Sequence, residues 1–187
     1  MPRTQDEVLR VAARLFAERG YRGTSVEDIG SACGISGPAV YKHFANKHAI
    51  LARLLGDISA HLLERGRAVA ASAAGPVDAL SELIAFHTDF ALEQPDLIRV
   101  QDLDLWSLDA PQGREVRRLQ RDYVELWVDV LCAVDASLSA EVARTRAQAT
   151  FGLLNSTPHS ARAPAVAREQ LLAMAWRALD GPPRCCG

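Results

Sequence analysis

Residues 25–51 read SVEDIGSACGISGPAVYKHFANKHAIL, and this stretch carries the strongest structural pattern in the chain. Val26, Ile29 and either Ala32 or Cys33 recur with the spacing of one face of an α-helix. Ser25 stands where a helix N-cap is expected, and Gly34 stands where a helix ends in a left-handed residue. The stretch therefore predicts a short helix, a tight turn and a second short helix, which is the helix-turn-helix pattern.

The second predicted helix, residues 37–44, has the features of a helix that enters a DNA groove. Ser36 is its predicted cap, and Pro38 lies in its first turn, where a missing N–H costs little. Val40 and Phe44 are four residues apart and are expected to face the core. The other positions offer small or polar side chains, which allow close approach to DNA and reach phosphates or base edges.

Lys47 opens the next predicted helix, behind Asn46 as its cap. A lysine in the first turn is unfavourable for the helix dipole, so a reason for its position is worth seeking. Two interpretations stay open: the ammonium pairs with a DNA phosphate, or the residue is ordinary surface variation.

The segment from Val8 to Leu55 resembles the DNA-binding domain of the TetR family of bacterial transcriptional regulators. AARLFAERGYRGTS (12–25) matches the first helix of that family and its exit loop. The Gly-Ile-Ser turn, the Tyr-x-His-Phe recognition helix and the lysine after it follow in the same order. The chain departs from the pattern at residues 37–39, where many members carry bulkier or polar residues. The recognition helix is also similar to those of actinobacterial regulators of fatty-acid and acyl-CoA metabolism.

The resemblance implies a DNA-binding site on a two-fold dimer. The dimer would place two recognition helices in successive major grooves of a palindromic double-stranded operator, about 34–36 Å apart. Expected at phosphates are Tyr41, His43 and Lys47, with Ser36 and Thr24 or Ser25 donating at helix starts; expected at bases are Lys42, Ala39, Gly37 and Pro38. Two alternatives stay open, because Tyr41 could pack against the first helix and His43 could cap a neighbouring carbonyl.

Composition indicates an all-α protein of 187 residues, because Ala, Leu, Arg and Glu dominate and β-branched runs are missing. No apolar run approaches the roughly 20 residues of a membrane-spanning helix. The N-terminus MPRTQDEV does not have the pattern of a signal peptide. We expect a cytoplasmic protein with no membrane contact.

The charge of the chain is unevenly distributed. The formal net charge is −2, but residues 1–50 hold seven Lys and Arg against five Asp and Glu, and the remainder holds fourteen against eighteen. The N-terminal segment is therefore the part suited to DNA.

Helical spacing predicts about nine helices in three segments. Residues 1–46 form the helix-turn-helix domain, whose first helix is opened by a capping box of Thr4 and Glu7. Residues 47–180 form a helical ligand-binding and dimerisation domain, reached through one long connecting helix over residues 47–71. Residues 181–187 are expected to be a disordered tail. The resemblance implies that the last two helices pair with their copies in a homodimer.

The resemblance also implies a small-molecule effector in the second domain. The candidate lining is the set of polar or aromatic residues on otherwise apolar faces: His87, Phe90, Trp106, Tyr123, Trp127, Phe151, Asn155 and His159. Each of these could instead be a satisfied core residue. As a set they favour a small hydrophobic effector, with an acyl-CoA as the specific hypothesis. The run Arg114, Arg117, Arg118 and Arg121 could bind its phosphates or could be a solvated face.

No pattern indicates an enzyme. The sequence has no Ser/His/Asp or Cys/His order typical of a nucleophilic enzyme, no Gly-rich phosphate loop and no HExxH motif. No catalytic residue, cofactor or metal site is therefore expected. Asp102, Asp104 and Asp109 could bind a divalent cation but are more simply solvated. Cys33 and Cys132 fit core positions, whereas Cys185 and Cys186 fall in the tail and could be a soft-metal or thiol site or have no role. The sequence thus favours a ligand-released repressor over an effector-independent DNA-binding protein or a helical small-molecule-binding module.

Overall fold

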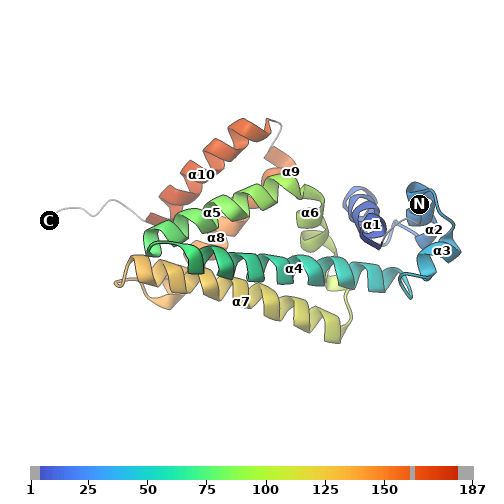
Figure 1. Ribbon diagram of the computed structural model, residues 1–187, viewed down its shortest axis with the longest axis horizontal. Helices are drawn as coiled ribbons and strands as arrows, with labels where there is room; N and C mark the ends of the chain where they lie inside the picture. Colours follow the sequence, from blue (N-terminus) through green and yellow to red (C-terminus); the bar gives the residue numbers. More distant parts are fainter. Residues whose placement is uncertain (1–4, 161–162, 181–187) are drawn as a thin grey trace. The chain divides into compact units, whose positions relative to one another are not determined.

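The computed structural model describes residues 5–160 and 163–180. Thr4 of the predicted capping box, and the predicted tail with Cys185 and Cys186, lie outside these residues. Figure 1 shows the described chain as helices α1 (Gln5–Arg19), α2 (Val26–Cys33), α3 (Gly37–Tyr41), α4 (Lys47–Ser72), α5 (Pro76–Glu93), α6 (Pro95–Asp104), α7 (Ala110–Val134), α8 (Ala140–Leu154), α9 (Thr157–Ser160) and α10 (Pro164–Asp180), with a 3₁₀ turn η1 (Leu105–Ser107). The predicted all-α fold is confirmed.

The contacts divide the chain into two compact units. The first unit is residues 1–61 with 96–119, and the second is residues 62–95 with 120–187. α4 and α7 each contribute to both units, and α6 belongs to the first. The domain boundary predicted after residue 46 falls at the start of α4, whereas the division between the units lies within that helix.

The first unit is built around a single apolar core. Every helix or part of a helix in this unit contributes to it: Val8, Leu15 and Phe16 from α1, Ile29 from α2, Val40 from α3, Leu51 and Leu55 from α4, Val100 from α6, and Val116 from α7. Phe44, predicted to be a core residue, is also buried there. The core therefore joins the three N-terminal helices to α6, which lies far away in the sequence.

Both ends of α2 follow the sequence prediction. The Ser25 hydroxyl accepts a hydrogen bond from the Asp28 N–H (3.0 Å), and the Asp28 carboxylate accepts one from the Ser25 N–H (2.8 Å). The hydrogen bonds from the Ser25 side chain and backbone hold the pKa of Asp28 below its usual value. Gly34 ends the helix in the left-handed region, with φ of 68°, where a residue without a Cβ meets no steric penalty.

The turn from α2 into α3 depends on a close approach at Gly30. A Cβ on this residue would lie 3.0 Å from the carbonyl oxygen of Ile35 and 3.2 Å from the backbone nitrogen of Gly37. α3 is shorter than the predicted 37–44, because it ends at Tyr41 and the chain then turns through Lys42 and His43. Ser36 is the N-cap of α3 as predicted, although its side chain makes no capping hydrogen bond.

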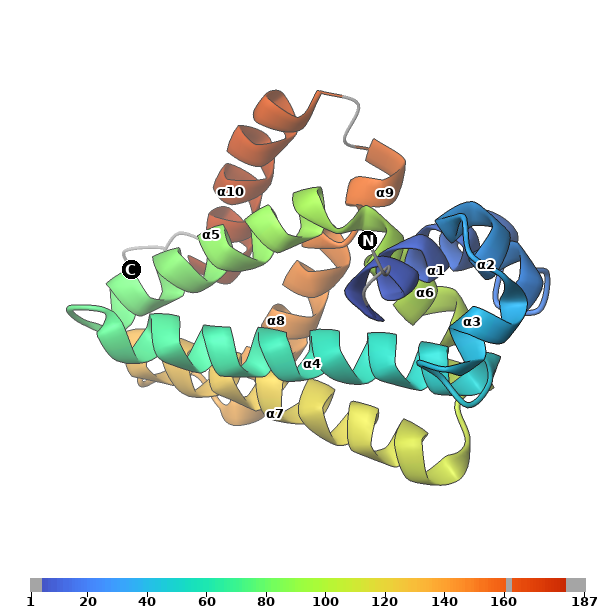
Figure 2. The same ribbon diagram turned by 45° about the vertical axis from the view of Figure 1, so that its right-hand side comes forward.

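The second unit packs α5 against α8, α9 and α10, and α8 against α10 (Figures 1 and 2). The end of α4 runs beside α7, and Gly66 allows this approach because a Cβ there would lie 2.7 Å from the Tyr123 ring. The Thr157 hydroxyl donates to the Ala91 carbonyl (2.7 Å), which ties α9 to α5. Within the described parts of the chain, no helix has the length and apolarity needed to cross a membrane.

We predict that Gly30→Val lowers the free energy of unfolding by about 1–3 kcal/mol, because the new side chain meets backbone atoms of the turn. Ala32→Val is the matched control: Ala32 is exposed on the same helix, so only the difference in helix propensity, roughly 0.5 kcal/mol, should be lost. Urea denaturation of both variants measures the difference. Equal losses would contradict the proposed crowding at Gly30.

Candidate functional site

The surface of α3 and the turn after it is polar and accessible. Tyr41 is 47% exposed, and Lys42 and His43 are also exposed. The exposure of Tyr41 argues against its burial on the first helix. Of the other predicted DNA-contacting residues, Ser25, Ser36 and Pro38 are exposed, and Gly37 and Ala39 are half-buried. The structure therefore brings together on one helix and its flanks most of the residues predicted to meet DNA.

Thr24 is different, because its side chain is buried. Its hydroxyl donates to the carbonyls of Leu15 (3.2 Å) and Gly20 (3.0 Å), and 1% of the residue is exposed. The Ser25 hydroxyl is also committed, donating to the Asp28 carboxylate at 2.6 Å. In this arrangement the Thr24 hydroxyl cannot donate to a phosphate as predicted. It instead fixes the end of α1.

Lys47 holds the loop between α1 and α2. Its ammonium donates to the backbone carbonyls of Tyr21 and Thr24, both at 2.7 Å. The same nitrogen lies 4.3 Å from the centre of the Tyr21 ring, which is a cation–π distance. These contacts use two of its three N–H groups, so one is left for the predicted phosphate contact. They also supply a reason for a lysine in the first turn of α4 that neither sequence interpretation contained.

Asp104 reaches the same loop from α6. Its Oδ2 accepts a hydrogen bond from the Tyr21 N–H (3.2 Å), and 7% of the residue is exposed. Burial raises the pKa of the Asp104 carboxyl, while the bond from Tyr21 and the charge of Lys47 oppose that rise. Sequence spacing does not predict this contact, because its partners are 83 residues apart.

In the second unit, six of the eight residues predicted to line an effector site come together. The His87 ring lies 4.9 Å from Phe151, 5.9 Å from Phe90 and 6.2 Å from Trp127, measured between ring centres. Its two nitrogens lie 3.2 Å from the Tyr123 hydroxyl and 3.0 Å from Asn155 Oδ1. We call His87, Phe90, Tyr123, Trp127, Phe151 and Asn155 the aromatic cluster.

The two remaining predicted residues lie elsewhere. Trp106 is in η1, belongs to the first unit and is 81% exposed. It borders a hollow together with Arg19, Arg22 and Asp104. His159 is exposed on α9. The ring contacts and hydrogen bonds of His87 described above include neither residue, so their place in an effector site stays a prediction.

Burial favours an uncharged His87, and its two hydrogen bonds fit the neutral ring. With the Asn155 oxygen facing Nε2, that nitrogen carries the proton, and Nδ1 accepts from the Tyr123 hydroxyl. Burial lowers the pKa of His87 to about 4, and the bond to Asn155 only partly opposes it. Burial likewise raises the pKa of Tyr123, although the neighbouring Trp127 indole favours its ionised form. The cluster is therefore neutral at physiological pH.

Two buried donors on α7 lack a partner. Among the described residues, Trp127 Nε1 and Gln120 Nε2 make no hydrogen bond of good geometry, although the indole lies near enough to Tyr123 to affect its pKa. Gln120, Tyr123 and Trp127 share one face of α7, at spacings of three and four residues. A buried donor without a partner is destabilising by about 1–3 kcal/mol. These positions therefore favour a molecule that offers hydrogen-bond acceptors.

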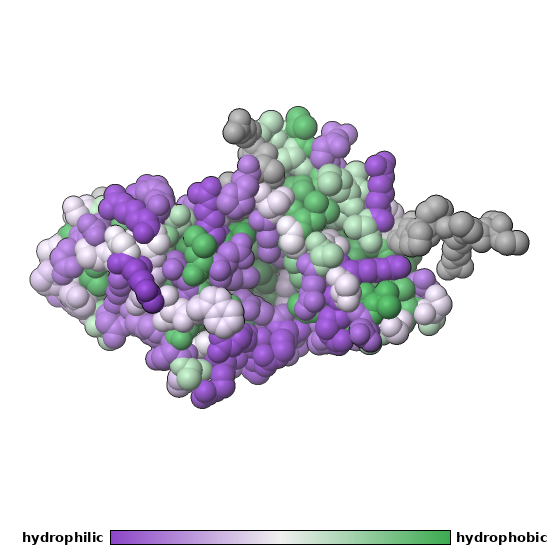
Figure 3. Space-filling model, turned by 180° about the vertical axis from the view of Figure 1, so that it is seen from behind, coloured by the Kyte–Doolittle hydropathy of each residue, from purple (hydrophilic) through white to green (hydrophobic). Residues whose placement is uncertain are grey.

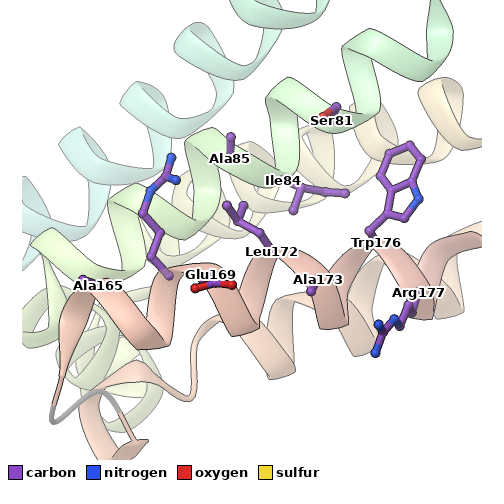
Figure 4. A pocket seen from close by; sticks show the side chains of 10 residues that line it. Ser81, Ile84, Ala85, Ala165, Glu169, Leu172, Ala173, Trp176 and Arg177 are labelled. Carbon is purple, nitrogen blue, oxygen red and sulfur yellow. The ribbon is translucent and has the colours of Figure 1, made fainter.

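A separate groove of about 580 Å³ lies between α5 and α10. Figure 4 shows Leu172 and Trp176 of α10 pointing toward α5, whereas Arg177 points away. Ile84 and Ala85 of α5 form the opposite wall. Arg168, on the rim, is held by Asp89 in a two-pronged ion pair with bonds of 2.6 and 3.0 Å. Sequence patterns do not predict this groove, because the residues that form it have the ordinary pattern of a packed helix pair.

The outer face of α8 and α10 carries apolar and small side chains. Val166 is 61% exposed, Met174 48% and Val142 44%. Ala149 and Gly152 of α8 are exposed as well. Apolar side chains gather over α10 on the face seen in Figure 3. Small residues on neighbouring helices allow close approach, so this face is suited to packing against another protein surface.

The polar alternatives raised by the sequence find little support. Asp104 is buried against Tyr21, and the Asp109 carboxylate accepts from the Gln112 N–H (3.3 Å). Within residues 5–160 and 163–180, no three His, Cys, Asp or Glu residues are grouped as metal ligands. Arg118 of the arginine run forms an ion pair with Glu115 at 2.7 Å. Cys33 is buried, as its sequence context predicts, whereas Cys132, also predicted to be a core residue, is only half-buried.

Two family models match the chain. Residues 8–54 match the model described as bacterial regulatory proteins of the tetR family, and residues 73–159 match a tetracyclin repressor-like C-terminal domain. The HTH-type transcriptional repressor KstR2 of Mycobacterium tuberculosis is 31% identical over 133 residues, which are 67% of this chain and 63% of that protein. The match thus spans less than two thirds of the length of that relative.

Solved structures share the fold. A TetR-family transcriptional regulator from Bordetella parapertussis 12822 has a TM-score of 0.83 at 25% identity, with 91% of this chain and 93% of that chain covered. KstR2 of M. tuberculosis, described as a ketosteroid transcriptional regulator, has a TM-score of 0.78 at 25% identity, covering 91% and 92%. AibR in complex with isovaleryl coenzyme A and operator DNA has a TM-score of 0.74 at 18% identity, covering 91% and 96%; at this identity the likeness shows the fold alone.

We predict that stability falls as the pH drops from about 6.5 to about 4, because unfolded His87 binds a proton in that range and folded His87 does not. The lowered pKa of His87 corresponds to a decrease in the free energy of unfolding on the order of 3 kcal/mol by pH 4. His87→Gln should flatten this part of the stability curve, measured by urea denaturation at a series of pH values. His43→Gln, at an exposed histidine, should keep the wild-type slope. An unchanged slope in His87→Gln would refute the assignment.

Proposed function

The chain belongs to the TetR family of bacterial regulatory proteins, and on this premise we propose that it is a DNA-binding transcriptional repressor released from its operator by a small molecule. The family and the matched relatives are transcriptional regulators, not enzymes. The relatives include repressors from actinobacteria. Such a regulator acts on chromosomal DNA, so the proposal includes a cytoplasmic location.

The observation that carries the proposal is the accessible polar surface of α3. Tyr41, Lys42 and His43 are exposed on α3 and just after it, while Val40 of the helix and Phe44 beyond its end are buried in the core. Lys42 and His43 offer donors to phosphates or base edges, and Gly37 and Ala39 add little bulk. We place this surface in the major groove, with Ser36 at a flanking phosphate; both donors of Ser25 are instead used by the Asp28 carboxylate.

Two copies of the chain are needed to read a palindromic operator. The exposed apolar face of α8 and α10, with Val142, Val166 and Met174, supports a homodimer through these two helices. In that dimer the two α3 helices would be spaced to enter successive major grooves, about 34–36 Å apart. A two-fold protein dimer then implies an operator with inverted half-sites.

The aromatic cluster is our proposed effector site. Its rings are apolar and its histidine is neutral, so it favours an uncharged, hydrophobic group. The unpaired donors Trp127 Nε1 and Gln120 Nε2 favour an oxygen acceptor on that group, such as a ketone or a thioester carbonyl. KstR2 is described as a ketosteroid regulator, and AibR was solved with isovaleryl coenzyme A. A ketosteroid and isovaleryl coenzyme A each carry such a carbonyl.

An acyl-CoA is the more specific form of this proposal. Its acyl thioester would occupy the aromatic cluster, and its phosphates require cations. Arg121 of α7, which belongs to the same unit as the cluster, offers one such cation. A steroid ketone would need no such cation. The two effector classes thus differ in whether Arg121 contributes to binding.

Two other functions would leave different evidence. An effector-independent DNA-binding protein would keep its operator with every ligand tested. A helical binding module with a vestigial helix-turn-helix would select no DNA sequence at any salt concentration. The capping box, the left-handed Gly34 and the tight turn at Gly30 are all intact, which favours a functional helix-turn-helix.

We predict that Lys42→Ala and Tyr41→Ala weaken binding to an operator duplex, defined as one selected from random DNA by the wild-type protein. Loss of one phosphate contact by Lys42 should reduce the slope of log K against log salt concentration by about one. Fluorescence anisotropy titrations at several salt concentrations measure both quantities. Arg67→Ala, which removes an exposed cation of the second unit, serves as the control and should bind normally. Wild-type affinity in both α3 variants would contradict the assignment.

We predict that Asn155→Trp abolishes release of this duplex by effectors and leaves DNA binding unchanged, because the indole fills space beside His87. The probes are a steroid ketone, the steroid hydrocarbon without its carbonyl, and isovaleryl coenzyme A. His159→Trp places the same side chain on the surface and should respond like the wild type. A normal response in Asn155→Trp would exclude the aromatic cluster as the effector site. Release by the hydrocarbon as well as by the ketone would show that effector binding needs no hydrogen-bond acceptor.

A further inference from the structure

The loop of residues 20–25 is fixed from two helices that are distant in sequence. The Lys47 ammonium of α4 donates to the carbonyls of Tyr21 and Thr24, both at 2.7 Å. The Asp104 carboxylate of α6 accepts the Tyr21 N–H at 3.2 Å. Tyr21 is therefore held at its carbonyl by a cation and at its amide by an anion.

The two charges depend on each other. Asp104 is 7% exposed, and a buried carboxylate is strongly destabilised unless hydrogen bonds or an opposite charge compensate it. The Tyr21 N–H supplies one hydrogen bond, and Lys47 supplies an opposite charge that acts on Asp104. Removing Asp104 therefore loosens the loop at Tyr21. It also removes the negative charge that compensates the positive charge of Lys47.

The position of this loop determines where the recognition helix lies. Ser25, the last residue of the loop, is the N-cap of α2. α2 and α3 pack closely at the turn between them, where a Cβ on Gly30 would lie 3.0 Å from the Ile35 carbonyl oxygen, so we expect the two helices to move together. A shift of the loop thus becomes a shift of α3 relative to α4 within the first unit.

We propose that Asp104 is a positioning residue for DNA binding, which acts through the Tyr21 N–H and Lys47 to hold α2 and α3 in the binding orientation. This role rests on the proposed DNA-binding function. Asp104 lies in the segment matched by the C-terminal family model, residues 73–159, yet its contacts are to the segment matched by the N-terminal model, residues 8–54. The residue itself touches no DNA in this assignment.

The test compares Asp104→Ala, Asp104→Asn and Asp102→Ala on the selected operator duplex. Asp104→Ala should weaken binding by about tenfold, the loss expected for one buried, charge-assisted hydrogen bond. The slope of log K against log salt concentration should stay at the wild-type value, because no phosphate contact is lost. Asp104→Asn keeps an oxygen for the Tyr21 N–H and should recover most of the affinity. Asp102→Ala removes an exposed acid from the same helix and should bind like the wild type.

Three outcomes would overturn the role of Asp104. The first is wild-type affinity in a folded Asp104→Ala variant, and the second is a changed salt slope. The third is independent of any variant: hydrogen exchange should show a protected Tyr21 amide in the wild-type protein, and exchange at the rate of an unstructured peptide would exclude the bond to Asp104. This measurement decides the matter if Asp104→Ala does not fold. A wild-type protein that selects no duplex would instead overturn the proposed DNA-binding function, and the positioning role with it.

Discussion

The Lys47 ammonium is the interaction on which the arrangement of the N-terminal helices depends. It binds two carbonyls of one loop and lies over the ring of Tyr21, which itself packs edge-on against Phe16 of α1 with ring centres 5.5 Å apart. A positive charge in the first turn of a helix is unfavourable in isolation. Here the loop carbonyls and Asp104 outweigh that penalty, and α1, α4 and α6 are joined at a single point.

The second unit has a different organising constraint, which is neutrality. His87 sits among four aromatic rings and uses both nitrogens on uncharged partners. Its surroundings exclude a proton far more effectively than water does, so charge in this region is unfavourable for protein and ligand alike. Polar specificity is left to the neutral donors of α7. α5, which carries His87, is followed after one residue by α6, which carries Asp104, so the residue that holds the Tyr21 loop follows the proposed effector site closely along the chain.

The local parts of this structure were predictable from the sequence, and the long-range contacts were not. The capping box of α2, the left-handed Gly34 and the burial of Val40 and Phe44 follow from spacing within a few residues. Six of eight predicted lining residues meet because polar and aromatic residues on apolar faces turn toward a shared core. The sequence shows Lys47 as an unfavourable charge at a helix start, but its loop partners are 23 and 26 residues away. Asp104 and Tyr21 are 83 residues apart. Periodicity carries no information about such pairs, and it also does not separate Trp106, exposed in η1, from the buried Trp127.

The central claim is that two copies of this chain place their α3 surfaces in neighbouring major grooves of one operator. Sequencing the duplexes that the wild-type protein selects from random DNA, followed by hydroxyl-radical footprinting, tests it directly. The account predicts an inverted repeat whose half-site centres are about one helical turn, or a whole number of turns, apart, with protection on one face of the duplex. Selection of a single, asymmetric half-site, or enrichment of no sequence at all, would contradict it.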